Sequence, residues 1–347
     1  MGLAGAGVLL LAGGCAHPKA KPNYLFYPAP PDEPRLQYLT GFSADSDVFK
    51  KGGFAKFILG SSVTYKPLGK PYGIATRRNA VFVCDSTFPA VEIFKLDKQA
   101  MDYLAPKGQG RMQTPINVAA DAFGNLYVTD TDREQVLIFG PDAAYLGAMG
   151  RKDEMKPCGL AMAGTELYVT DLKNHQVRVY RASDRTLLRS FPKETGDAKG
   201  KLYSPTNVAV DQQGRVYVAD TGAFCIQVYG ADGNYLRTIG RQGVGPGRFA
   251  RPRGIAVDHE GRIYVADAAT QVVQVFDNEG RLLIFFGDPS ITGPGSTNLP
   301  AGVAVDYENA HYFQKFAAPG YQVEYLIWLT NQYGDPRVSV YGFLKKQ

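Results

Sequence analysis

The sequence predicts an all-β fold built from six copies of one unit, and three observations support this prediction. Aromatic residues make up 12% of the 347 residues, nearly all of them Tyr and Phe, and 39 residues are Gly. This mixture favours strands joined by tight turns. A Pro-x-(Gly or Asn)-aliphatic-Ala motif occurs six times, at intervals of 42 to 48 residues, a repeat length that suits a four-stranded propeller blade. Further short alternating segments follow each copy.

The first segment of each unit ends in an alanine: Ala75, Ala119, Ala161, Ala209, Ala256 and Ala304. Each segment is short and rich in β-branched residues, so we interpret it as a strand. A small residue at the same place in all six strands indicates that the strands converge on a common axis, where six backbones crowd together.

The second segment of each unit carries an aromatic residue: Phe82, Tyr127, Tyr168, Tyr217, Tyr264 and Trp328. Three residues later stands an acid in five units and an amide in the last: Asp85, Asp130, Asp171, Asp220, Asp267 and Asn331. Because this acid recurs in nearly every unit, we interpret it as a structural cap on the turn that follows the strand, and not as a catalytic group.

Third segments lie at 91–94, 136–139, 177–180, 226–229, 273–276 and 338–341, and fourth segments at 145–149, 187–191, 235–239 and 282–286. The last unit has no fourth segment of its own, whereas residues 36–42 resemble one. We expect 36–42 to pair with 338–341 and to close the ring, which leaves no open edge between the two ends. The prediction is a six-bladed β-propeller of four-stranded antiparallel blades over residues 35–347.

The N-terminus has the features of an export signal. Residues 3–12 form an apolar run that is too short to span a bilayer, and small residues lead from it to Cys15. This pattern resembles the lipobox of bacterial lipoproteins, which implies cleavage after residue 14, lipidation of Cys15 and attachment to the cell envelope, with Ala16 pointing to the outer membrane. Six prolines between Ala16 and Pro34 predict an extended tether over residues 15–34.

The units also resemble NHL repeats, through the repeated Tyr-Val-Ala-Asp and the segment Asp171-Leu172-Lys173-Asn174-His175-Gln176-Val177. The resemblance implies the propeller fold. It leaves the activity open, because NHL propellers include protein-binding and RNA-binding modules, sensor domains and a few enzymes.

Two kinds of propeller enzyme are the catalytic alternatives. The resemblance to amidating lyases would imply zinc held by histidines of several blades, but the four histidines of this chain are not spaced to converge. Lactonase-like propellers hold an axial metal through Glu, Asn and Asp. Here Asn117 and Asn207 occupy axial positions, with glycine in the other four units. We therefore expect no metal, no cofactor and no catalysis. The enzyme with an axial metal remains the alternative, as does an assembly factor for envelope complexes.

Two further features of the sequence allow more than one interpretation. A disulfide between Cys158 and Cys225 requires their Cα atoms to lie within about 7 Å of each other. In the last unit, residues 307–325 replace a short turn and carry Tyr312, Phe313 and Phe316. A long insertion of this kind either packs on the propeller or forms a patch for a partner.

We expect the partner to bind the loop face, defined here as the face that carries the connections between blades and those between second and third strands. The connections between blades are long and rich in Lys and Arg: Arg151, Lys152, Arg241, Arg248, Arg251 and Arg253 are the residues we assign to binding. The net charge of +5 is spread along the chain. We expect a monomer that binds a protein or an acidic surface polymer, contacts the membrane only through its lipid and binds no nucleic acid.

Overall fold

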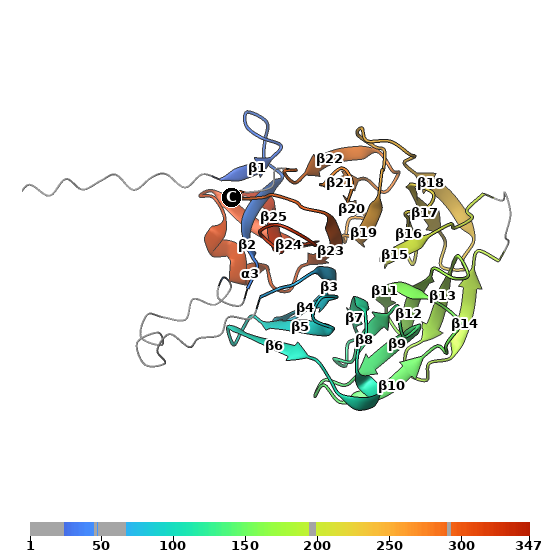
Figure 1. The fold of residues 1–347 in the computed structure, drawn as a ribbon. Coiled ribbons are helices and arrows are strands. Elements are labelled where there is room, and N and C mark those ends of the chain that lie inside the picture. Colours follow the sequence, from blue (N-terminus) through green and yellow to red (C-terminus); the bar gives the residue numbers. More distant parts are fainter. Residues whose placement is uncertain (1–23, 45–46, 48–66, 194–198, 290–292) are drawn as a thin grey trace, which may run out of the picture.

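The computed structural model describes residues 24–44, 47, 67–193, 199–289 and 293–347. Within them, six antiparallel sheets stand around one axis, as Figure 1 shows. The prediction of an all-β, six-bladed propeller is confirmed. The signal peptide, Cys15 and the first part of the tether lie outside the described residues. Among the described residues, no helix is both long and apolar enough to cross a membrane.

We number the blades in chain order and name their strands a to d from the axis outward. Blade 1 contains β3 (Pro71–Arg77), β4 (Ala80–Asp85), β5 (Ala90–Lys95) and β6 (Ala100–Leu104). Blade 2 contains β7 (Pro115–Ala120), β8 (Leu126–Asp130), β9 (Gln135–Phe139) and β10 (Tyr145–Met149). Blade 3 contains β11 (Pro157–Ala163), β12 (Glu166–Asp171), β13 (Gln176–Arg181) and β14 (Leu187–Phe191).

Blade 4 contains β15 (Pro205–Val210), β16 (Val216–Asp220), β17 (Cys225–Tyr229) and β18 (Tyr235–Ile239). Blade 5 contains β19 (Pro252–Val257), β20 (Ile263–Asp267), β21 (Val272–Phe276) and β22 (Leu282–Phe286). A 3-10 turn, η2 (Gly108–Gly110), lies in the connection from blade 1 to blade 2. These bounds match the strands expected from the repeats.

Blade 6 joins the two ends of the described chain. Its strands β23 (Pro300–Asp306), β24 (Tyr321–Asn331) and β25 (Val338–Lys346) are completed by β2 (Leu36–Phe42), which pairs antiparallel with β25. The predicted closure is therefore confirmed. A fifth strand, β1 (Leu25–Tyr27), pairs with β2 on the outside. The sheet thus includes part of the segment expected to be tether, because β2 offers an unpaired edge to which the preceding residues add.

The apolar core lies between neighbouring blades. Between blades 6 and 1, for example, Trp328 and Phe94 are fully buried, and Phe42 of β2 packs between them with ring centroids 6.1 and 5.2 Å away. The aromatic residues of the second and third strands fill the space that widens away from the axis. The N-terminal strand therefore contributes to the packing between blades as well as to the hydrogen bonding of one blade.

The repeated aspartates cap turns, as the sequence analysis proposed. In blade 5, Asp267 accepts hydrogen bonds from the backbone N–H groups of Ala250 (2.7 Å), Arg251 (3.0 Å), Ala269 (3.0 Å) and Thr270 (3.2 Å). Asp85, Asp130, Asp171 and Asp220 make corresponding bonds. Each carboxylate thus joins the segment that leads into its blade and the turn between the second and third strands of that blade. The loop face therefore rests on a rigid base.

The insertion in blade 6 packs on the propeller. It forms α3 (Ala310–Phe313) and the 3-10 turn η3 (Gln314–Phe316). Phe313 is buried edge-on against Trp328 at 5.2 Å, and the Tyr312 hydroxyl donates to Asn79 of blade 1 at 2.9 Å. Of the three residues considered for a partner patch, only Phe316 is exposed, at 37%. The insertion therefore makes a second contact between blades 6 and 1, in addition to the packing of Phe42.

The cysteines that the structure describes, Cys84, Cys158 and Cys225, are buried free thiols. The Cys158–Cys225 disulfide left open by the sequence is therefore not formed. Cys158 lies in the first strand of blade 3, near the axis, while Cys225 begins the third strand of blade 4.

Candidate functional site

The two axial asparagines are bonded to each other. Asn117 of blade 2 donates from Nδ2 to Oδ1 of Asn207 in blade 4, at 3.1 Å. Each Oδ1 also accepts the backbone N–H of the next residue, Val118 at 2.8 Å and Val208 at 2.9 Å. Both side chains are buried. Both Oδ1 atoms and Nδ2 of Asn117 are thus used inside the fold, which agrees with a structural role at the axis.

In blades 1, 3, 5 and 6 the third residue of the first strand, two residues before the repeated alanine, is a glycine that the neighbouring blade approaches closely. At Gly254, an added Cβ would lie 2.6 Å from the carbonyl oxygen of Ala301 in the neighbouring blade. Glycine is therefore the residue that lets these backbones meet. Among the described residues, no group of three or more His, Cys, Asp or Glu side chains is placed to hold a metal ion.

On the loop face, side chains from alternate blades gather over the axis. Arg253 of blade 5 reaches past blade 6, so that its guanidinium lies 5.2 Å from the ring centroid of Tyr72 in blade 1. Nη1 of Arg253 donates to Oε1 of Gln332 at 2.8 Å. Its other N–H groups have no hydrogen-bond partner among the residues described. The Arg253 side chain is therefore fixed in place while part of its donor capacity remains unused.

Tyr72 and Cys158 are uncharged at neutral pH. Burial raises the pKa of the Tyr72 phenol to about 12 and that of the Cys158 thiol to about 12, and the positive charge of Arg253 only partly opposes both shifts. Arg253 lies where the axis opens on the loop face, which we call the mouth. Its positive charge is therefore not balanced by a phenolate or a thiolate.

Two more cations on this face lie over tyrosine rings. Lys70 is 5.3 Å from the ring centroid of Tyr333, and Lys201 is 4.9 Å from that of Tyr203. Tyr203 and Tyr333 are each 50% exposed. Together with the residues at the mouth, these pairs form a surface across blades 4, 5, 6 and 1, which we call the basic arc: Lys70, Tyr72, Lys201, Tyr203, Arg251, Arg253 and Tyr333.

The structure separates the six basic residues assigned to binding into two groups. Arg241, Arg248 and Arg251 are exposed and make no ion pair with any described residue, and Arg253 lies at the mouth beside them. Arg151 and Lys152 lie on blade 3, next to the acidic residues Asp153 and Glu154. Those two acids pair with Lys173 and Arg178, so this part of the face carries acids as well as cations. Four of the six residues therefore share one side of the loop face.

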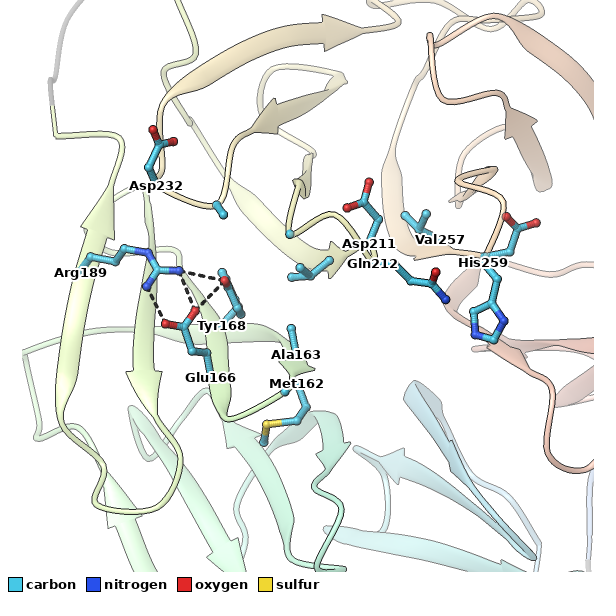
Figure 2. A pocket seen from close by; sticks show the side chains of 15 residues that line it. Met162, Ala163, Glu166, Tyr168, Arg189, Asp211, Gln212, Asp232, Val257 and His259 are labelled. Carbon is cyan, nitrogen blue, oxygen red and sulfur yellow. Dashed lines mark hydrogen bonds and ion pairs between the residues drawn. The ribbon is translucent and has the colours of Figure 1, made fainter.

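The opposite face holds a hollow of about 900 Å³ between blades 3, 4 and 5, shown in Figure 2. Glu166, Tyr168 and Arg189 form a hydrogen-bonded cluster on one side of it. Arg189 donates to both carboxylate oxygens of Glu166, at 2.8 and 2.7 Å, and to the Tyr168 hydroxyl at 2.9 Å. The bond from Arg189 lowers the pKa of Glu166, so this carboxyl stays ionised at neutral pH.

This hollow was not predicted from the sequence. It opens because blade 3 turns from β11 to β12 through only Gly164 and Thr165, whereas blades 2, 4 and 5 use longer turns that begin with an aspartate. The missing aspartate was the available signal. In blade 4, that aspartate, Asp211, accepts from Arg215 at 2.6 Å and from Tyr217 at 3.0 Å. The Glu166 cluster thus stands where blades 2, 4 and 5 have this aspartate.

Comparison with known proteins supports the fold and leaves the activity open. Residues 165–284 match a family model described as a 6-bladed beta-propeller. No curated protein matches the chain in sequence. A Bacteroides thetaiotaomicron protein of unknown function is structurally similar, with 16% identity, a TM-score of 0.60, and coverage of 80% of this chain and 70% of that one.

Two named enzymes share the fold at equally low identity. A gluconolactonase from Xanthomonas campestris has 16% identity and a TM-score of 0.57, with 89% of each chain covered. A streptogramin B lyase has 10% identity and a TM-score of 0.55, with 81% of this chain and 95% of that one covered. At these identities the similarity concerns the fold alone, because propellers of one architecture host unrelated functions.

Proposed function

We propose that this protein is an exported, lipid-anchored binding scaffold that recognises an acidic partner through the basic arc. One observation carries the proposal: cations from blades 1, 4 and 5 lie on one face, and Arg251 and Arg253 keep guanidinium groups that no described acid neutralises. The aspartate caps hold the loops of this face on a rigid base. Such an arrangement favours encounter with acidic partners by electrostatic steering.

The catalytic alternative is a lactonase- or lyase-like enzyme with an axial metal. Two of the structural relatives carry such enzyme names, which is a reason to test the idea. We favour binding because Asn117 and Asn207 use their amides on each other and on backbone groups. An assembly factor for envelope complexes is compatible with the same surface and differs only in its partner. We expect the scaffold to be monomeric.

Charge reversal on the loop face tests the proposal. Replacing Arg248 and Arg251 with Glu is expected to weaken partner capture about tenfold or more and to reduce its salt dependence, since two exposed cations become anions. The melting temperature should change little, because both side chains are exposed and unpaired. Capture that stays unchanged, with its salt dependence intact, would place the binding surface elsewhere.

Removal of the lipidated thiol tests the anchor. The variant Cys15→Ser is expected to lose lipid labelling and to leave the membrane fraction. Cys15 is the residue predicted to carry the lipid, and serine has no thiol to be lipidated. Membrane fractionation with labelled fatty acid measures both effects. Retention of Cys15→Ser in the membrane would contradict the lipoprotein proposal and leave the loop-face proposal untouched.

A further inference from the structure

The basic arc repeats one combination of groups, a cation held over a tyrosine ring. It occurs as Lys201 with Tyr203, Arg253 with Tyr72, and Lys70 with Tyr333. Phe88, in the turn of blade 1 on the same face, is a further aromatic side chain and is 47% exposed. Surface tyrosines half open to solvent offer flat apolar contact, while the neighbouring cations offer charged donors.

In the turns between second and third strands, acidic side chains are few on this side of the loop face. The turns between second and third strands in blades 4, 5 and 1 (221–224, 268–271 and 86–89) contain no Asp or Glu. The corresponding turn of blade 6 contains Asp335, whose carboxylate accepts a hydrogen bond from Ser43. The capping aspartates beneath these turns are buried and saturated with backbone N–H groups. These turns therefore place few competing acceptors beside the donors and rings of the arc.

A ligand that fits this surface must combine a ring with an anionic group at each repeat. An acidic peptide supplies carboxylates on flexible stems without rings to stack, so it would leave Tyr203 and Tyr333 unused. In a polymer of uronic acids, each sugar offers an apolar C–H face to an aromatic ring and a carboxylate to the neighbouring cation. Single-stranded nucleic acid also combines rings and anions, but an exported protein would not ordinarily meet it.

We propose that the partner of the basic arc is an anionic polysaccharide whose sugar carboxylates pair with Arg251, Arg253 and Lys201 while its rings stack on Tyr203 and Tyr333. This inference rests on the proposed function and names the chemical class of its partner. Arg253 holds the central position, because Gln332 and Tyr72 orient its guanidinium over the axis.

The test uses calorimetric titration of the full chain with four probes. They are an oligogalacturonate of defined length, its methyl ester, a polyglutamate of equal charge, and a single-stranded oligodeoxynucleotide. The oligogalacturonate is expected to bind at least about tenfold more tightly than each of the others, because only it offers both stackable sugars and carboxylates. Equal or tighter binding of polyglutamate or of the oligonucleotide would overturn the assignment.

Variants separate stacking from charge. Arg253→Gln should weaken oligogalacturonate binding about tenfold, and Tyr203→Ala should weaken it several-fold without changing the weak binding of polyglutamate. The matched controls lie on the opposite face: Lys98→Gln removes one exposed cation, and Phe123→Ala removes a ring that is 82% exposed. Neither should change binding. An unchanged affinity of Tyr203→Ala for the oligogalacturonate would contradict the proposal that the partner is an anionic polysaccharide.

The outcome also separates this inference from the proposed function. If the oligogalacturonate does not bind, but the captured partner is a protein whose retention falls in the Arg248→Glu, Arg251→Glu variant, the loop face is the binding surface and the glycan is the wrong partner. If capture is also insensitive to that charge reversal, both proposals are wrong.

Discussion

The variant Phe42→Ala is expected to lose about 3–5 kcal/mol of the free energy of unfolding, as buried phenylalanines generally do when truncated. Phe42 is buried and contacts Phe94 of blade 1 and Trp328 of blade 6, so its ring links the two blades that the closing strand must hold together. The total stability of a domain is only about 5–15 kcal/mol. One side chain of the N-terminal strand therefore supports a large share of ring closure.

Urea unfolding followed by tyrosine and tryptophan fluorescence measures this loss. The matched control is Phe123→Ala, since that ring is 82% exposed and its removal should cost less than about 0.5 kcal/mol. A chain without residues 24–43 lacks both β1 and β2. It should be still less stable and should aggregate through the free edge of β25. A truncated chain as stable as the parent would show that β2 does not close the ring in solution.

The repeats made the fold predictable from the sequence because each one marks where its strands begin and end. The alternating strands, the small axial residue and the capping aspartate recur together, and each is visible without an alignment. Closure by residues 36–42 could be predicted because the last repeat lacked its fourth strand. The added strand β1 could not, since Leu25–Tyr27 stands among prolines and pairs only because β2 presents an edge.

The binding surface was only partly predictable. The sequence indicated a basic loop face and placed acids beside Arg151 and Lys152, but it could not show which cations those acids pair with. In the structure Asp153 pairs with Lys173, at 3.6 Å, a residue from a separate turn. The contact of Arg253 in blade 5 with Tyr72 in blade 1 depends on the geometry of the ring, and no local sequence pattern indicates it.

One buried group departs from the repeat without an evident structural benefit. Glu92 lies in the third strand of blade 1, fully buried, and neither of its carboxyl oxygens accepts a hydrogen bond from a described residue. At the corresponding position, blades 4 and 5 have glutamine. Gln274 in blade 5 donates to the backbone carbonyl of Arg248 and accepts from the N–H of Gly247, both at 2.8 Å. Glutamine thus satisfies the site, whereas glutamate brings a titratable group into the core.

Burial raises the pKa of Glu92 from 4.5 to about 10, and the neighbouring Asp85 carboxylate adds to the shift. The folded protein therefore keeps the Glu92 proton over a range in which the unfolded chain has released it. The contribution of protonated Glu92 to stability is fully present below about pH 4.5 and is lost progressively as the pH rises toward 10. The loss amounts to at most about 1.4 kcal/mol per pH unit within that window.

The variant Glu92→Gln is expected to be more stable than the parent, by a margin that increases from pH 5 to pH 9 and reaches several kcal/mol. Glutamine carries no proton to lose, and its amide could donate to the neighbouring Asp85 carboxylate. Urea unfolding at successive pH values measures the margin. The control Glu324→Gln removes an exposed carboxylate and should shift stability by less than about 0.5 kcal/mol at every pH. A margin for Glu92→Gln that does not vary with pH would show that Glu92 is ionised in the folded protein.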